Sequence, residues 1–302
     1  RLAQASARVA TGAAGVIVAR GAESMSRVPM SGVFVQPDPE LTEEEVGTDV
    51  SVGITAENVA DEYGVSREDQ DRFALRSHER AVDAIDQGRF EDELVPLTLE
   101  ETHYQSANGH AGEATTETVT LEVDEGPRRD TNLDVLAKLP AAFREGGSVT
   151  PGNSSQRSDG GAATVVMSGD RVADLGVDPL GALRGFAVAG VDPELMGIGP
   201  AEAIPQALAQ TGLSVDDIGL VELNEAFASQ SLAVIREAGL DPNIVNVNGG
   251  AIALGHPLGC TGAKLTATLL HEMIRREVRY GLCTMCVGGG MGAAGVFENL
   301  RL

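Results

Sequence analysis

Two stretches of the chain are nearly continuous runs of apolar residues that end in glycine. They are residues 15–21 (Gly-Val-Ile-Val-Ala-Arg-Gly) and residues 284–290 (Thr-Met-Cys-Val-Gly-Gly-Gly). Runs of this kind are typical of strands in a sheet that helices cover on both faces. The pattern that they share also indicates a weak internal duplication.

A helical period occupies residues 66–88. Ser66 and Asp69 resemble a capping box at its start, and Gly88 is suited to end it. Between them, one face recurs at four-residue spacing, through Phe73, Ser77, Ala81 and Ile85. This spacing predicts an amphipathic helix.

The middle of the chain differs from the C-terminal half. Residues 100–125 are polar with little periodicity, and residues 108–109 (Asn-Gly) and 115–116 (Thr-Thr) are suited to turns, so we expect a surface excursion. After about residue 158, strand-like segments (162–167, 218–223 and 282–287) alternate with helix-like ones (200–209 and 265–274). The predicted fold class is therefore α/β, with a compact layered domain in the C-terminal half.

Composition narrows the class of protein. With 302 residues, of which 42% are apolar, the chain has enough material for two domains or one large α/β unit. No run of about 18 apolar residues and no signal-peptide pattern is present, so we expect a cytoplasmic protein without a membrane segment. Three cysteines, Cys260, Cys283 and Cys286, are too few for a disulfide framework and are expected to be reduced.

The charge balance is strongly acidic. Arginine and lysine number 22 against 45 aspartates and glutamates, which gives a net charge of −23, and only Lys138 and Lys264 are lysines. A general nucleic-acid-binding surface is excluded. One interpretation of this excess of acidic residues is that it provides ordinary solubility. The other, which we favour, is a halophilic protein adapted to molar salt, where the Debye length falls to about 3 Å and repulsion between carboxylates is screened.

The most specific chemical pattern surrounds His256. This histidine lies in a glycine-lined loop, residues 246–259, which leads into a helix predicted to begin near Ala263. Glycines let a substrate approach the backbone closely, and a helix N-terminus places partial positive charge where an anion can develop. A histidine beside a proline has a structural role more often than a catalytic one. The glycine-lined loop makes these two interpretations more nearly equal here.

Cys286 ends an apolar strand and is followed by the glycine-rich residues 287–292. A sulfur at this position suits a thiol base beside an oxyanion site. Alternatively, Cys283 and Cys286 form a redox pair, or they join Cys260 and His256 as zinc ligands. Because residues three apart on a strand point to opposite faces, we favour this alternative less. Cys260 and Cys283 are equally consistent with inert buried thiols.

Three further positions combine polar chemistry with a turn. Asn224 follows a predicted strand and opens a helix, where it could be an N-cap or could orient a water or a carbonyl. Ser155 ends the turn of residues 152–155, before a predicted strand. Arg128 and Arg129 are a basic pair suited either to phosphate groups or to surface ion pairs.

Together these segments resemble the thiolase family. Residues 249–262 reproduce its histidine signature, residues 224–227 its asparagine motif, residues 286–292 its C-terminal cysteine loop, and residues 23–26 its early motif. The resemblance runs from about Arg1 to Leu302. It implies two similar halves packed as a five-layered α/β/α/β/α structure with an inserted loop domain. Residues 1–26 would be the remnant of an incomplete first half, residues 27–150 the loop domain over coenzyme A, residues 151–175 the return to the first half, and residues 176–302 the second half.

The resemblance also implies roles for individual residues. The family transfers acyl groups between coenzyme A thioesters by a ping-pong mechanism, in which a cysteine thiolate takes up the acyl group. His256 would activate that cysteine, Cys286 would transfer the α-proton, and Asn224 with a bound water would form one oxyanion hole with His256. The N–H of Gly288 would contribute to the other.

Binding partners follow from the same likeness. The residues that would line the coenzyme A pocket are Ser155, Arg128, Phe143 and Phe227. Coenzyme A thioesters would be substrates, with no permanently bound cofactor or metal, and a homodimer or homotetramer is expected, without nucleic acid or membrane as a partner.

Two departures from the family pattern limit what is implied. Many members have methionine at the place of Val52, and those that synthesise acetoacetyl-CoA often have histidine at that of Ser51, so acyl-chain preference stays open. The family's nucleophile lies in a Cys-x-Ser-Gly-Leu segment, which is expected just upstream of the position matched by Arg1. None of the three cysteines replaces it, so we expect the chain alone to be inactive. The alternative is a non-catalytic thiolase-like subunit that binds coenzyme A or a partner.

Overall fold

The computed structural model describes residues 1–30, 32, 37–44, 46–107 and 110–302. Its helices are α1 (Leu2–Ala10), α2 (Pro39–Glu44), α3 (Val52–Glu62), α4 (Arg67–Asp86), α5 (Leu133–Leu136), α6 (Gly169–Leu175), α7 (Gly199–Thr211), α8 (Ala228–Glu237), α9 (Ala251–Leu254) and α10 (Thr261–Arg275). Short 3-10 turns occupy Val46–Asp49, Pro193–Ile198 and Val215–Asp217. The strands are β1 (Val16–Ser24), β2 (Leu97–Ala107), β3 (His110–Leu121), β4 (Asp159–Met167), β5 (Gly181–Gly190), β6 (Leu220–Leu223), β7 (Tyr280–Val287) and β8 (Met291–Asn299).

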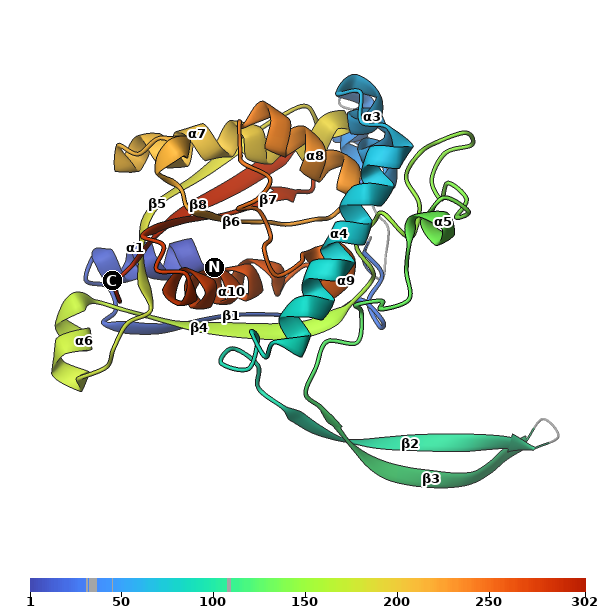
Figure 1. Ribbon diagram of the computed structural model, residues 1–302, viewed down its shortest axis with the longest axis horizontal. Helices are drawn as coiled ribbons and strands as arrows, with labels where there is room; N and C mark the ends of the chain where they lie inside the picture. Colours follow the sequence, from blue (N-terminus) through green and yellow to red (C-terminus); the bar gives the residue numbers. More distant parts are fainter. Residues whose placement is uncertain (31, 33–36, 45, 108–109) are drawn as a thin grey trace.

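The C-terminal half forms a four-stranded sheet in the order β5-β8-β7-β6. Strands β6 and β7 are parallel, and the other neighbouring pairs are antiparallel. Helices α7 and α8 lie on one side of the sheet and α10 on the other (Figure 1). All four residues of β6 are buried, as expected of a strand covered on both faces. The strands predicted over residues 218–223 and 282–287, and both predicted helices, are confirmed.

A second sheet contains β1 and β4, which pair antiparallel from Val16–Met167 to Ser24–Asp159. Helices α1 and α10 separate it from the C-terminal sheet (Figure 1). On its other face Val18 is 60% exposed and Val165 is 55% exposed. The prediction of a strand in residues 15–21 is confirmed, but the expectation that both of its faces are covered is wrong for the described part of the chain. From α7 and α8 to the β1–β4 sheet, the described residues form four α/β/α/β layers of the expected five.

Helix α4 confirms the prediction from the four-residue spacing. The Ser66 hydroxyl accepts a hydrogen bond from the Asp69 N–H at 3.1 Å, and the cap is worth about 1 kcal/mol. Phe73, Ser77 and Ala81 are buried along one face. Gly88 follows the helix with a φ of 66°, which a residue without a side chain adopts at low cost.

The polar stretch from residue 100 to residue 125 is not turn-rich: most of it belongs to a long hairpin of β2 and β3, which projects from the body of the protein (Figure 1). The predicted turn at residues 115–116 is wrong, because Thr115 and Thr116 pair with His103 and Thr102 inside the hairpin. Threonine favours extended backbone, and the projecting strands have no core that would impose an apolar period. The predicted turn at residues 108–109 lies outside the described residues. The expectation of a surface excursion is confirmed.

Helix α3 packs against α8, which brings residues of the predicted loop domain onto the C-terminal half. Across the described residues, no helix is both long and apolar enough to cross a membrane. The boundaries proposed at residues 26, 150 and 175 stay predictions.

Candidate active site

The carboxyl ends of β6 and β7 bring two of the predicted catalytic residues to one edge of the sheet. Leu223 pairs with Thr284 in the parallel register, and the next residue, Asn224, donates its backbone N–H to the Thr284 carbonyl at 2.9 Å. Cys286 follows two residues later on β7. Helix α10 packs on these strands and leads back into β7, so its N-terminal end, with the loop that carries His256, lies at the same edge.

Asn224 is fully buried, and its side chain is unusual in having no protein partner. Neither the amide oxygen nor the amide nitrogen accepts or donates a hydrogen bond within the described residues. The alternative role as a helix cap is wrong, because Phe227 is the N-cap of α8 and its N–H donates to the Gln230 side chain at 3.2 Å. A buried amide without partners costs free energy, so Asn224 is suited to orient a water or a carbonyl oxygen.

Glu225, which the sequence analysis did not single out, links the asparagine motif to the histidine signature. Its carboxylate accepts hydrogen bonds from Asn246 Nδ2 at 2.8 Å, Ser77 Oγ at 2.6 Å and the Ile252 N–H at 3.2 Å. A Cβ at Gly250 would stand 2.1 Å from the Glu225 carboxyl carbon, so a glycine is required there. The sequence offers one signal for Glu225, because it lies between two apolar segments. A glutamate in such a place is buried only when it is paired.

The tautomer of His256 follows from its neighbours. Its Nδ1 lies 2.5 Å from Thr261 Oγ1, and the Thr261 hydroxyl donates to the Pro257 carbonyl at 3.0 Å. The threonine oxygen therefore accepts, Nδ1 carries the hydrogen, and Nε2 keeps a free lone pair. Burial, with a smaller contribution from the charge of Lys264, lowers the pKa of His256 to about 4. The imidazole is neutral at neutral pH and can accept a proton.

Cys286 is buried in an apolar cluster with Ala56, Val149, Met196 and Phe227. Burial raises the pKa of its thiol to about 11, although its own backbone N–H opposes the rise.

Cys283 packs in a different cluster, with Leu265 and Met273. The two thiols lie on opposite faces of β7, as their spacing predicts, which contradicts the alternative of a redox pair. Burial also raises the pKa of Cys283, to about 12, and that of Cys260.

Gly288 is exposed in the turn between β7 and β8, two residues beyond Cys286. No atom beyond its chain neighbours lies within 4 Å of the position that a Cβ would occupy. A ligand can therefore approach this stretch of backbone, as an oxyanion site requires.

Three of the four predicted coenzyme A residues gather near the Cys286 cluster. The Ser155 N–H donates to the Ala226 carbonyl at 2.9 Å. Phe143 packs edge-to-face on Phe227, with ring centroids 6.0 Å apart, and is 39% exposed. Val52, the position that departs from the family pattern, packs against the same cluster.

Arg128 and Arg129 do not act as a pair. Arg129 makes a bidentate ion pair with Asp86, at 2.8 and 2.5 Å. Arg128 donates its backbone N–H to His78 Nδ1 at 3.1 Å, and its exposed guanidinium has no carboxylate partner among the described residues. Of the two arginines, only Arg129 therefore forms the expected surface ion pair. The Arg128 guanidinium can still bind a phosphate.

Two cavities in the described structure are lined by neither Asn224, His256 nor Cys286. One, of about 290 Å³, lies between α1, β1 and the β5–β8 pair. The other, of about 150 Å³, adjoins Lys264.

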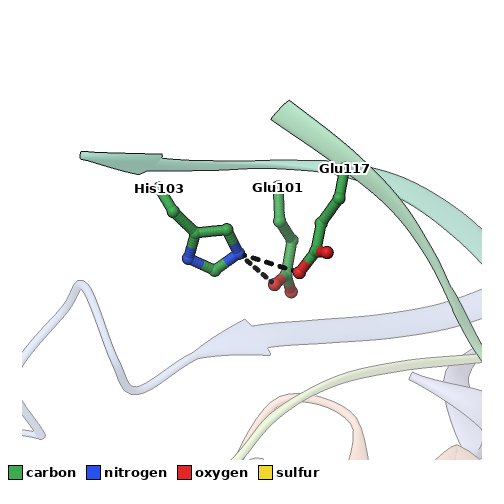
Figure 2. A group of neighbouring side chains, drawn as sticks. All are labelled: Glu101, His103 and Glu117. Carbon is green, nitrogen blue, oxygen red and sulfur yellow. Dashed lines mark hydrogen bonds and ion pairs between the residues drawn. The ribbon is translucent and has the colours of Figure 1, made fainter. Parts of the chain in front are cut away.

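A group with the spacing of metal ligands lies on the projecting hairpin. Figure 2 shows the His103 imidazole beside Glu117 and Glu101, with Nε2 3.1 and 3.6 Å from their carboxylates. All three side chains are exposed, and no other such group occurs in the described part of the chain. The cysteines and His256, considered above as zinc ligands, are not brought together.

Comparison with known proteins identifies the class to which this fold and site belong. Residues 2–170 match the family described as "Thiolase, N-terminal domain", and residues 177–299 match "Thiolase, C-terminal domain". The chain belongs to the thiolase family, which confirms the resemblance and the expected fold class.

Individual relatives are similar over nearly the whole chain. The 3-ketoacyl-CoA thiolase of Bacillus subtilis (strain 168) is 54% identical over 297 residues, which are 98% of this chain and 75% of that protein. The acetyl-CoA acetyltransferase of Pseudomonas aeruginosa is 45% identical, with 94% and 72% covered. The structure of human mitochondrial 3-ketoacyl-CoA thiolase in complex with CoA superposes with a TM-score of 0.84 at 38% identity, with 99% of this chain and 74% of that chain covered.

Proposed function

We propose that this chain carries the proton-transfer and coenzyme A-binding parts of a thiolase active site. The reaction is the reversible Claisen condensation of acetyl-CoA, or thiolytic cleavage of a 3-ketoacyl-CoA, by a ping-pong mechanism. The observation that carries this proposal is the set of groups at one sheet edge: a neutral His256, a buried Asn224 amide without a partner among the described residues, and Cys286 on the adjacent strand. The names of the relatives and the coenzyme A complex of the human thiolase support it.

Each residue has a defined part in the first half-reaction. His256 Nε2 takes the proton of the nucleophilic thiol, which adds to the thioester carbonyl, and coenzyme A leaves with that proton. Asn224, through a bound water, stabilises the oxyanion together with His256. A donor of this kind is worth on the order of 3 kcal/mol.

In the second half-reaction, the Cys286 thiolate removes an α-proton from acetyl-CoA. The carbanion attacks the acyl-enzyme, a carbon–carbon bond forms, and the enzyme thiolate leaves. The N–H of Gly288 stabilises the charge on the thioester oxygen. In cleavage these steps run backwards, and the Cys286 thiol returns the proton. A positioned base contributes roughly 10²–10⁴-fold in rate.

The coenzyme A arm would run along Ser155, with Phe143 and Phe227 lining the pocket and Arg128 free to bind a phosphate. We also propose that the protein forms a homodimer or homotetramer, since the peroxisomal thiolase of Saccharomyces cerevisiae is described as dimeric. Cytoplasmic location and adaptation to high salt are proposed from composition.

A second candidate function is a thiolase-like subunit that binds coenzyme A without turnover. It is favoured by the state of the thiols: all three cysteines are free and buried, with raised pKa values, so none supplies a thiolate at neutral pH.

One experiment separates the candidates. Calorimetry measures coenzyme A binding to the chain, and radiolabelled acetyl-CoA measures acylation, with and without an added N-terminal segment that carries Cys-x-Ser-Gly. We expect binding without acylation by the chain alone, and acylation with thiolysis of acetoacetyl-CoA once the segment is present. Binding with no acylation in either form would favour the second candidate. Thiolysis by the chain as written, abolished by Cys286→Ala, would contradict the assignment of the nucleophile.

A further inference from the structure

The backbone that leads into His256 is held by a single ammonium group. Lys264, in the first turns of α10, donates from Nζ to the carbonyls of Leu254 and Gly255, both at 3.0 Å. These are the last carbonyl of α9 and the one immediately before His256. A cation is favourable at a helix C-terminus, where such carbonyls otherwise lack partners.

The same segment is fixed from its other side. Gln156 donates to the Ala253 carbonyl at 2.9 Å, so three consecutive carbonyls before His256 are held by side chains. Gly255 has a φ of 82°, and a Cβ there would stand 2.2 Å from Ser158 Oγ. The segment therefore has little freedom to adopt another conformation.

The charge of Lys264 acts on two carboxyl groups from neighbouring elements, one half-buried and one buried. Glu93, in the segment after α4, accepts a hydrogen bond from Thr268 Oγ1 at 3.1 Å through one oxygen, while its other oxygen has no partner among the described residues. Glu222 on β6 is 1% exposed, and one of its oxygens is also unpartnered. The charge of Lys264 lowers the pKa of both groups, against the larger effect of burial.

The charged groups around this position have one sign except for the lysine and a more distant arginine. Asp124 acts on Glu93 from the segment after β3, and Arg275 acts on it from the far end of α10. Lys264, Glu93 and Cys260 line the cavity of about 150 Å³ beside the histidine loop. The ammonium group is therefore oriented by the two carbonyls, and its charge acts on nearby carboxyl groups.

We propose that Lys264 is a positioning residue for His256. By holding the Leu254 and Gly255 carbonyls, it fixes the imidazole in the orientation in which Nδ1 donates to Thr261 and Nε2 is free. Its positive charge also disfavours protonation of the ring. The link to catalysis rests on the function proposed above, whereas the effect on the ring is a property of the folded chain.

The test is histidine-labelled ¹⁵N NMR of the full chain across pH, with the His256 signals assigned by their loss in His256→Asn. In Lys264→Met we expect a mixture of ring tautomers at pH 7 and a pKa of His256 above that of the wild type, because a nearby positive charge that lowers this pKa is lost. Lys264→Arg keeps the charge and donors and should retain the single tautomer. Lys138→Met, which removes the other lysine at an exposed position, is the matched control and should leave the ring unchanged.

A folded Lys264→Met chain with the tautomer and pKa of the wild type would overturn the proposal. If circular dichroism shows that this variant unfolds, Lys264→Gln, which keeps an amide donor but no charge, is measured in its place, and an unchanged pKa would again refute the charge effect. No turnover is required, so failure of the proposed acyl transfer would leave this result standing.

Discussion

Replacing Glu93 by glutamine should flatten the pH dependence of stability. Burial raises the pKa of Glu93 from an ordinary value of 4.5 to about 7, although a hydrogen bond from Thr268 and the charge of Lys264 oppose the rise. The folded protein therefore binds this proton more tightly than the unfolded chain does. The stabilisation is fully present below about pH 4.5 and is lost as the pH rises to about 7.

The size of the effect follows from that difference. At about 1.4 kcal/mol per pH unit, the rise corresponds to about 3 kcal/mol, of which about 2 to 3 kcal/mol separates pH 5 from pH 8. Glutamine carries no titrating proton and cannot contribute this difference. Its amide nitrogen would take the place of an oxygen that has no partner in the part of the chain that the structure describes, which costs about 1–3 kcal/mol at every pH and does not alter the slope.

Urea denaturation at pH 5 and pH 8, at one fixed molar salt concentration, measures this difference in the free energy of unfolding. We expect the difference between the two pH values to change by about 2 to 3 kcal/mol in Glu93→Gln relative to wild type, in the direction of greater relative stability at pH 8. Glu91→Gln, the same change at an exposed position two residues away, should leave it unaltered. An unchanged pH dependence in Glu93→Gln would refute the assignment of a buried, proton-binding carboxyl.

Three further outcomes are expected. Because the net charge is −23, lowering the salt from molar to millimolar should restore repulsion among carboxylates and unfold the protein, and a constant circular dichroism signal would contradict salt adaptation. In a version that carries the nucleophile, Cys286→Ala should still take up a radiolabelled acyl group without condensing it, whereas His256→Ala should acylate poorly; equal acylation defects would show that the roles are misassigned. Gly250→Ala should lower the free energy of unfolding by about 1–3 kcal/mol through its clash with the Glu225 carboxylate, measured by urea denaturation, while Gly169→Ala, which has open space, should have little effect.

The sequence predicted those elements whose pattern reflects burial. Helix α4 and strands β6 and β7 were found because a face or a whole strand is apolar, and the motifs around Asn224, His256 and Cys286 were found because glycine and reactive residues rarely coincide. The hairpin of β2 and β3 was missed, because strands without a core carry no apolar alternation. Its threonines, such as the cross-strand pair Thr102 and Thr116 at 3.1 Å, stabilise it locally instead.

The supporting residues of the site were beyond reach of the sequence for a different reason. Glu225 and Lys264 act through partners that are distant in the sequence or lie on the other side of a turn. Only the folded structure shows these hydrogen bonds. The prediction that both faces of β1 are covered failed because an apolar run indicates only which residues favour burial. It does not report which residues supply the cover.

Burial also sets the protonation states of His256 and Cys286 in the site. It lowers the pKa of His256 to about 4 and raises that of Cys286 to about 11, so at neutral pH the imidazole is free to accept a proton and the thiol holds one. Under the proposed function, this is the arrangement that cleavage requires, since the thiol must deliver a proton to the carbanion of the departing acetyl-CoA. Condensation needs the Cys286 thiolate first, so the thiol must lose its proton before it can remove an α-proton from acetyl-CoA. The resting site therefore holds its protons as cleavage requires, and condensation needs one more proton transfer, away from Cys286.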